Sequence, residues 1–141
     1  MPSWKKYKED FILLLEAGFI AVNQADEDAA TKLFKAAALL DPKNPLPKVG
    51  IGYLHLHKLE LKQAINAFEE VLEKDPANDM AKAFLGLSMS LQPSSLEKGE
   101  KILAQTLKSN DPMIKKLSDN SIDFVERFIK KNPGPASQPR K

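Results

Sequence analysis

The sequence predicts an all-α fold made of three helix–turn–helix repeats followed by one further helix. The first indication is that small, aromatic and proline residues recur along the chain at one constant interval. The second is that apolar residues between these positions follow helical intervals rather than the alternation of a strand. The residues in the common register are Gly18, Gly52 and Gly86, Ala30 and Ala64, Phe34 and Phe68, and Pro42 and Pro76.

The constant interval matches the tetratricopeptide repeat, a helix–turn–helix unit of about 34 residues. We therefore predict repeats over about residues 11–44, 45–78 and 79–112, stacked into a short right-handed superhelix. A capping helix over residues 113–131 is expected to cover the last repeat, whose apolar face would otherwise meet water. These elements make a single domain over residues 1–131, and the polar tail 132–141 is expected to be disordered.

Local signals place the helix boundaries. The first helix is predicted over residues 9–24 after a loose lead-in, and the second over 27–40 with Asp26 as its N-cap. Asp41 and Pro42 end the second helix, because the residue before a proline is pushed out of the α region. Further helices are predicted over 45–58, 62–74, 79–91, 95–109 and 113–131. In the last of these, one stripe at helical spacing consists of Ile114, Leu117, Ile122, Val125, Phe128 and Ile129.

The composition excludes several classes of function. A net charge of +2 indicates no nucleic-acid partner, and the absence of cysteine excludes disulfides and thiolate metal sites. The apolar run from Phe11 to Val22 contains Glu16 and is too short to cross a bilayer, which takes about 20 apolar residues in a helix. We expect a cytoplasmic protein that neither enters a membrane nor binds nucleic acid.

No catalytic group of residues is apparent. His55 and His57 are two apart on a predicted helix, so they face different directions and cannot share a metal ion. The stretch from Gly86 to Ser90 lacks the final glycine of a nucleophile elbow and lies inside a predicted helix. We therefore expect no enzyme activity, no cofactor and no metal.

The concave side of the predicted superhelix is the candidate binding site. The first helix of each repeat lines this side, and eleven of its residues fall on the concave stripe at steps of three and four. If each leaves roughly 45 Å² exposed, the groove presents about 500 Å² of apolar surface, near the upper end of patches tolerated on monomers. We call these eleven residues the predicted groove set: Ile12, Leu15, Phe19, Val22, Leu46, Val49, Tyr53, Leu56, Met80, Ala83 and Leu87.

Such a groove predicts a protein partner that supplies an amphipathic helix or an extended apolar segment. Leu15, Phe19, Met80 and Phe84 occupy places where repeat proteins that clamp acidic chaperone tails carry Lys and Asn, so a carboxylate clamp is not expected. One alternative stays open at this level. The chain's own C-terminal helix, or tight curvature of the array, could already fill the groove.

Three tetratricopeptide repeats in a small chain, an apolar concave face and a short terminal helix resemble the chaperones of bacterial type III secretion, most closely the needle-subunit type. The resemblance implies that the groove holds an apolar helix of the needle subunit and prevents its premature self-assembly. It also implies a small helical co-chaperone on the first repeat, where Leu13 and Ile20 lie outside the groove set. The alternatives are a chaperone of translocator proteins and a scaffold outside secretion, in which the apolar face is a docking or homodimer surface.

Overall fold

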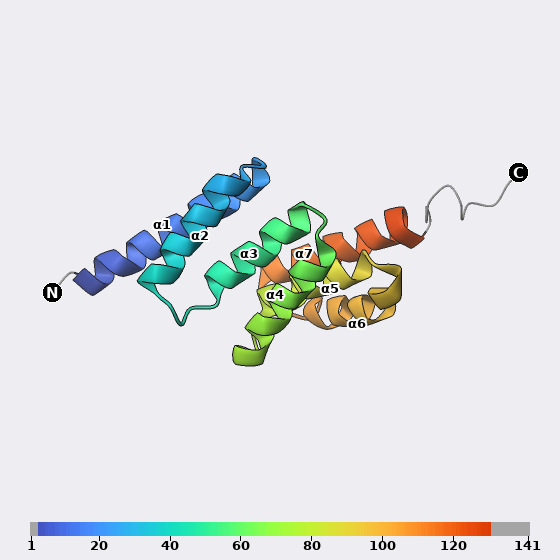
Figure 1. The fold of residues 1–141 in the computed structure, drawn as a ribbon. Coiled ribbons are helices and arrows are strands. Elements are labelled where there is room, and N and C mark those ends of the chain that lie inside the picture. Colours follow the sequence, from blue (N-terminus) through green and yellow to red (C-terminus); the bar gives the residue numbers. More distant parts are fainter. Residues whose placement is uncertain (1–2, 131–141) are drawn as a thin grey trace, which may run out of the picture. The chain divides into compact units, whose positions relative to one another are not determined.

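The computed structural model describes residues 3–130, with side chains from residue 5 onward. The regular elements of this range are helices (Figure 1). The described residues fall into two compact units, one up to Ala77 and one from Asn78 onward, whereas the sequence predicts a single domain over 1–131. The first unit contains α1 (Ser3–Asn23), α2 (Glu27–Leu40), α3 (Leu46–His57) and α4 (Leu61–Lys74). The second contains α5 (Asp79–Ser90), the 3₁₀ helix η1 (Pro93–Ser95), α6 (Leu96–Thr106), α7 (Pro112–Phe124) and the π-helix η2 (Val125–Lys130).

The first unit consists of two helical hairpins. Helix α1 packs on α2, α3 packs on α4, and α3 also packs on both α1 and α2. Buried apolar side chains from the first three helices form the core between them, and most come from α1 and α2. The core residues are Phe11, Leu15, Ala21, Val22, Ala30, Phe34, Ala37 and Leu54.

Each of the two hairpins has the same kind of close contact, between a glycine of its first helix and a phenylalanine of its second. A Cβ atom placed on Gly18 would lie 2.5 Å from Cε1 of Phe34, and one placed on Gly52 would lie 2.5 Å from Cε1 of Phe68. The two rings are almost fully buried, at 1% and 0% exposure. Only a residue without a side chain lets the first helix of each hairpin approach the ring of the second. The fold is therefore repeat-like at this contact, with the spacing seen in the sequence.

The turns inside the two hairpins are also alike. Ala25 has a φ angle of 60° and Leu59 one of 58°, and the two residues occupy equivalent positions of the sequence repeat. A left-handed conformation is uncommon for residues other than glycine, so its recurrence indicates one turn geometry used twice. The predicted N-cap of the second helix is confirmed, because the Asp26 side chain accepts a hydrogen bond of 3.1 Å from the amide of Ala29.

Several predicted boundaries are wrong. Helix α1 begins at Ser3 and not near residue 9, so residues 3–8 are helical rather than a loose lead-in. This segment contains no glycine or proline, and its lysines are compatible with a helix. Helix α6 is shorter than predicted, since it begins at Leu96 after a 3₁₀ turn and ends at Thr106.

The second unit is a hairpin of α5 and α6 with α7 packed against both. The buried stripe of α7 consists of Ile114, Ser118, Ser121 and Val125. The Ser118 hydroxyl contacts the hydroxyl of Thr106 at 2.7 Å and the carbonyl of Ile114 at 2.8 Å, which satisfies a polar group in a buried position. Small serines let α7 approach its neighbours closely.

The stripe predicted for the last helix is confirmed in part. Its members Ile114 and Val125 are buried, and Phe128 is exposed. The other three are partly buried, namely Leu117, Ile122 and Ile129. The helix continues through residues 118–121 and changes to a π-helix at Val125. The tail predicted to be disordered, 132–141, lies outside the described residues. None of the helices described has both the length and the apolar character needed to cross a membrane.

Candidate protein-binding surface

The outer face of α1 carries large apolar side chains in contact with solvent. Ile12, Leu13 and Ile20 are 47%, 65% and 56% exposed. On the opposite side of the same helix, Phe11 and Leu15 are buried at 6% and 7%. The helix therefore carries large apolar side chains on both its core side and its outer side, where Glu16 is exposed between Ile12 and Ile20. We call Ile12, Leu13 and Ile20 the α1 patch.

The exposure of this patch follows from the repeat. Leu54 is the equivalent of Ile20 in the next repeat and is only 6% exposed, because α3 packs onto α1 and α2. Pro47, the equivalent of Leu13, is buried as well. Among the described residues of the first unit, no earlier hairpin covers α1 in this way. Leu13 and Ile20 are therefore exposed apolar residues at positions whose equivalents in the next repeat are buried.

Next to the α1 patch, aromatic rings join α1 to α3. The ring centroids of Phe19 and Tyr53 are 5.4 Å apart, and those of Phe19 and Phe34 are 5.2 Å apart in an edge-to-face arrangement. The Tyr53 hydroxyl donates a hydrogen bond of 2.7 Å to Oδ1 of Asn23, at the end of α1. The ring centroids of His57 and Tyr53 are 4.6 Å apart. Phe19 and Tyr53 remain partly exposed, so a partner on this side of the unit would meet two fixed aromatic edges.

Burial has a measurable electrostatic effect here. Removal of Tyr53 from water raises the pKa of its phenol above the ordinary value of 10.0, because burial disfavours the phenolate. The hydroxyl therefore stays protonated, and able to donate to Asn23, throughout the physiological range.

The predicted groove set is divided by the structure. Ile12 is exposed, and five members keep part of their surface accessible: Phe19, Leu46, Tyr53, Met80 and Leu87. The five remaining members are buried at 7% exposure or less, namely Leu15, Val22, Val49, Leu56 and Ala83. The contact between Phe19 and Tyr53 brings α1 and α3 members together, whereas Met80, Ala83 and Leu87 lie on α5 of the second unit. Helical spacing could not separate core positions from surface positions.

Charged residues connect the hairpins of the first unit at one corner. The His55 Nδ1 and Glu60 Oε1 atoms are 2.7 Å apart, and Lys58 Nζ lies 3.3 Å from Glu60 Oε2. Lys58 also pairs with Glu27 at the start of α2. The hydrogen bond with His55, followed by that with Lys58, lowers the pKa of the Glu60 carboxyl. Every member of this cluster is engaged with another, which suits a structural role. No group of three or more metal-ligating side chains occurs among the described residues.

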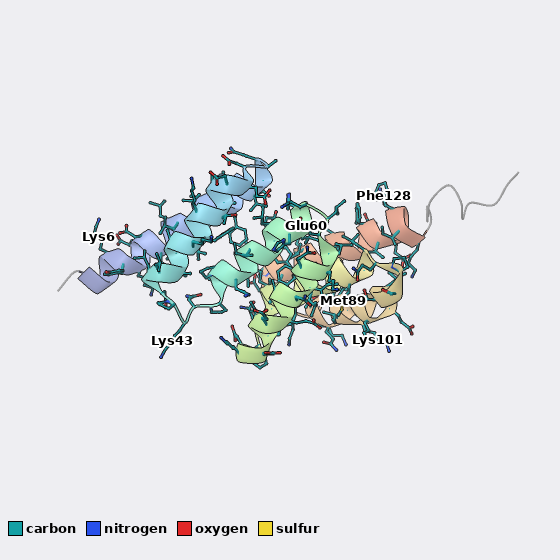
Figure 2. All side chains as sticks on the ribbon, viewed as in Figure 1. Lys6, Lys43, Glu60, Met89, Lys101 and Phe128 are labelled. Atoms are coloured by element: carbon teal, nitrogen blue, oxygen red, sulfur yellow. The ribbon has the colours of Figure 1, made fainter. Side chains whose placement is uncertain are left out.

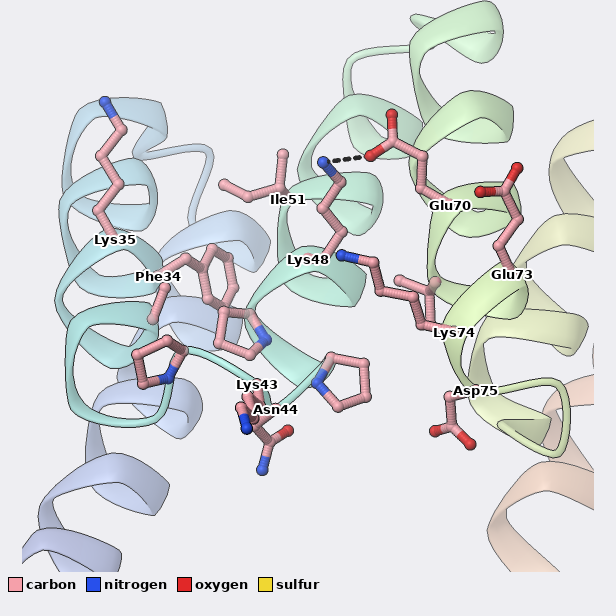
Figure 3. A pocket seen from close by; sticks show the side chains of 15 residues that line it. Phe34, Lys35, Lys43, Asn44, Lys48, Ile51, Glu70, Glu73, Lys74 and Asp75 are labelled. Carbon is pink, nitrogen blue, oxygen red and sulfur yellow. Dashed lines mark ion pairs between the residues drawn. The ribbon is translucent and has the colours of Figure 1, made fainter.

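A cleft of about 650 Å³ opens between α2, the α2–α3 loop, α3 and α4 (Figure 3). Its apolar lining includes Phe34, Ile51 and Val71, together with two prolines of the loop and one at the start of α3. Lys48 pairs with Glu70 at 2.6 Å across the cleft, and this contact lowers the pKa of the Glu70 carboxyl. Both charge signs line the opening, so the cleft selects no class of charged ligand. The charged lining residues are Lys35, Lys43, Lys48, Lys74, Glu70, Glu73 and Asp75.

Sequence reasoning missed a second exposed apolar set, which lies on α7 and η2. Met113 is 69% exposed, and Phe124 and Phe128 are 44% and 55% exposed. The signal that could have found it is their spacing, since all three fall on one helical face that excludes the buried Ile114 and Val125.

Comparison with models of known protein families finds none that matches this chain, and no curated protein matches it either.

Proposed function

We propose that this chain is a protein-binding module that holds an apolar helical segment of another protein against the α1–α3 side of its first unit. The observation that carries the proposal is the α1 patch, three large aliphatic side chains about half or more exposed, beside the fixed rings of Phe19 and Tyr53. The largest apolar patch on a typical monomer measures about 300–600 Å² and is often functional. Covering roughly 300 Å² of such surface would contribute on the order of 7 kcal/mol before the costs of association.

The repeat contacts favour a finer description. The shared contacts of Gly18 and Gly52 with phenylalanine rings, together with the paired turns at Ala25 and Leu59, support tetratricopeptide hairpins. We propose three such repeats in a short right-handed superhelix, capped by α7. In that arrangement the predicted groove set contributes its accessible members to the binding surface.

The client that we propose is the needle subunit of a type III secretion system, on the resemblance to needle-subunit chaperones. A needle subunit polymerises through apolar helical surface, and a cytoplasmic chaperone that covers this surface keeps the subunit monomeric. A small helical co-chaperone on Leu13 and Ile20 is part of the same proposal. A chaperone of translocator proteins, or a scaffold outside secretion, would use the same surface for an extended segment or a folded partner.

The test compares single charge insertions on two exposed leucines. Leu13 belongs to the α1 patch, whereas Leu39 belongs to α2 and is 82% exposed. Immobilised wild-type protein would capture partners from the source organism for identification by mass spectrometry. Each captured protein would then be purified and titrated calorimetrically against wild type, Leu13→Glu, Ile12→Glu and Leu39→Glu.

We expect a 1:1 complex with a protein that contains an apolar helix. Glutamate at Ile12 or Leu13 should weaken the complex by about tenfold or more, because a charge would be desolvated in the interface. Leu39→Glu should leave it unchanged. Equal affinities for all four proteins would refute the proposed surface, and a captured needle subunit is required for the secretion role.

A further inference from the structure

The second exposed apolar set lies on one line along α7 and η2. Met113, Leu117, Phe124 and Phe128 follow one another at steps of four, seven and four residues, which keeps them on one helical face. The rings of Phe124 and Phe128 contact each other with centroids 5.1 Å apart. Figure 2 shows Phe128 at the outer side of the last helix. We call these four residues the α7 row.

The α7 row is held rigidly although its side chains are exposed. Ile114 and Val125, which lie about 100° round the helix from the row, are anchored in the core at 4% and 1% exposure. Lys130 pairs with Glu100 of α6 and with Glu126, each at 2.9 Å, and thereby ties η2 to the hairpin. A surface already fixed in this way loses little conformational freedom when a partner covers it.

A helix that only closes a repeat array should present a polar outer face. The α7 row instead offers a methionine, a leucine and two phenylalanines. Aromatic residues and methionine are enriched in protein interfaces, where they supply large contact area. A π-helical segment, such as the one that carries Phe128, is also frequent at functional sites.

We propose that the α7 row is the interface of a homodimer, in which the α7 helices of two copies pack antiparallel about a two-fold axis near Asn120. Asn120 lies on the same face as the row and near its midpoint, seven residues after Met113 and eight before Phe128. The two-fold therefore sets Met113 opposite Phe128 of the second copy, and Leu117 opposite Phe124. Asn120 lies opposite Asn120 of the second copy, and an amide side chain can both donate and accept a hydrogen bond.

Charge complementarity indicates that the partner of the α7 row is a second copy of the chain. Lys116 and Asp123 flank the row on the same side, because they are seven residues apart. The antiparallel two-fold places Lys116 opposite Asp123 of the second copy, and the symmetry repeats this pair. A parallel arrangement would turn this flank toward the other flank of the second copy, and both pairs would be lost. Asp123 also pairs with Arg127 of its own chain at 3.3 Å, but with both side chains more than 60% exposed it stays accessible.

The size of the row indicates the strength of the dimer. The exposed parts of the four apolar side chains amount to roughly 400 Å² per copy, about half of what a standard stable interface buries on each partner. The polar flanks add to this area. We expect a dissociation constant on the order of 10–100 μM, so that dimer and monomer exchange with concentration.

Sedimentation equilibrium of the full chain, across concentrations from about tenfold below to tenfold above that range, tests the pairing. Lys116→Asp turns both attractive pairs into repulsive ones and should weaken the dimer by about tenfold. The double variant Lys116→Asp, Asp123→Lys exchanges the charges and should restore the affinity to within about threefold. Lys115→Asp makes the same change of charge at the adjacent exposed position off the row, and should leave the affinity unchanged.

A second pair of variants separates this surface from the one on α1. Phe124→Ser with Phe128→Ser should yield a monomer whose circular dichroism remains helical, whereas Ile20→Asp should remain a dimer. A monomeric wild type, equal effects of the Lys115 and Lys116 variants, or no rescue by the double variant would overturn the proposal. Self-association lost with Ile20→Asp and kept in the Phe variant would overturn it as well, and would leave the proposed function intact.

Discussion

For a Gly50→Ala substitution, helix propensity predicts a gain in stability, whereas the structure predicts a loss. Gly50 lies in the first half of α3, where alanine would favour the helix by about 1 kcal/mol. A Cβ atom at this position, however, would fall inside contact distance of Cε1 of Phe34, and lie 2.5 Å from Cζ and 2.7 Å from Cδ1. Phe34 is 1% exposed, and Gly18 touches the same ring from α1. The ring is therefore held between α1 and α3.

The expected effect of Gly50→Ala is therefore a net loss of stability. Overpacking a tight core costs about 1–3 kcal/mol, and displacement of the ring would also separate α3 from α1 and α2. Set against the gain in propensity, we expect the free energy of unfolding to fall by up to about 2 kcal/mol. Asn66→Ala, at an exposed position in α4, reports propensity without a clash and should be neutral or stabilising by roughly 0.5 kcal/mol.

Urea unfolding followed by circular dichroism gives these differences, and a double-mutant cycle assigns the cause. Phe34→Leu replaces the ring that the new methyl group would contact with a smaller side chain. In the Gly50→Ala background its cost should be at least about 1 kcal/mol smaller than in wild type, because it relieves the clash. A Gly50→Ala protein that is more stable than wild type, or additive effects of the two substitutions, would refute this account of the contact.

Two further predictions concern ionisable groups of the first unit. In a Tyr7→Phe protein Tyr53 is the sole tyrosine, and its phenolate absorbance should appear with a midpoint above pH 10.0 and return to about 10 in urea. The raised pKa stabilises the fold below pH 10, and this contribution should disappear as the pH rises through the folded pKa; a midpoint of 10 in the folded protein would exclude burial of the phenol. The pKa shift of Glu60 has the opposite sign, since its pairing with His55 lowers the carboxyl pKa below 4.5. Wild type should be more stable than Glu60→Gln at pH 7, and the two urea midpoints should converge as the pH falls through the folded pKa; a difference that is independent of pH would show that the ion pair adds nothing.

The structure also changes which variants test the binding surface. Leu15 belongs to the predicted groove set, yet at 7% exposure it is a core residue, and a glutamate there would unfold the hairpin. Ile12 lies three positions earlier and is 47% exposed, so a charge at this position can block a partner without disturbing the core. The distinction depends on α3, which covers one side of α1 and leaves the other open.

The constant interval between equivalent glycines and phenylalanines was sufficient to predict the helical hairpins. Glycine is needed wherever a helix must approach a ring, and Gly18 and Gly52 meet Phe34 and Phe68 as their common register implies. The cap at Asp26 was likewise readable, because a side chain that satisfies a free amide acts within three residues. Information of this kind is local or strictly periodic, and the chain carries it without reference to its neighbours.

Exposure was decided by the tertiary structure. Periodicity places a residue on a face of a helix, but whether that face is covered depends on which other helices pack there. Ile20 and Leu54 occupy the same register, and one is 56% exposed while the other is buried. In α7, hydroxyls that bond to Ile114 and Thr106 let a serine take the core side. Larger side chains such as Phe124 are left on the outside, because close packing favours small residues where helices touch.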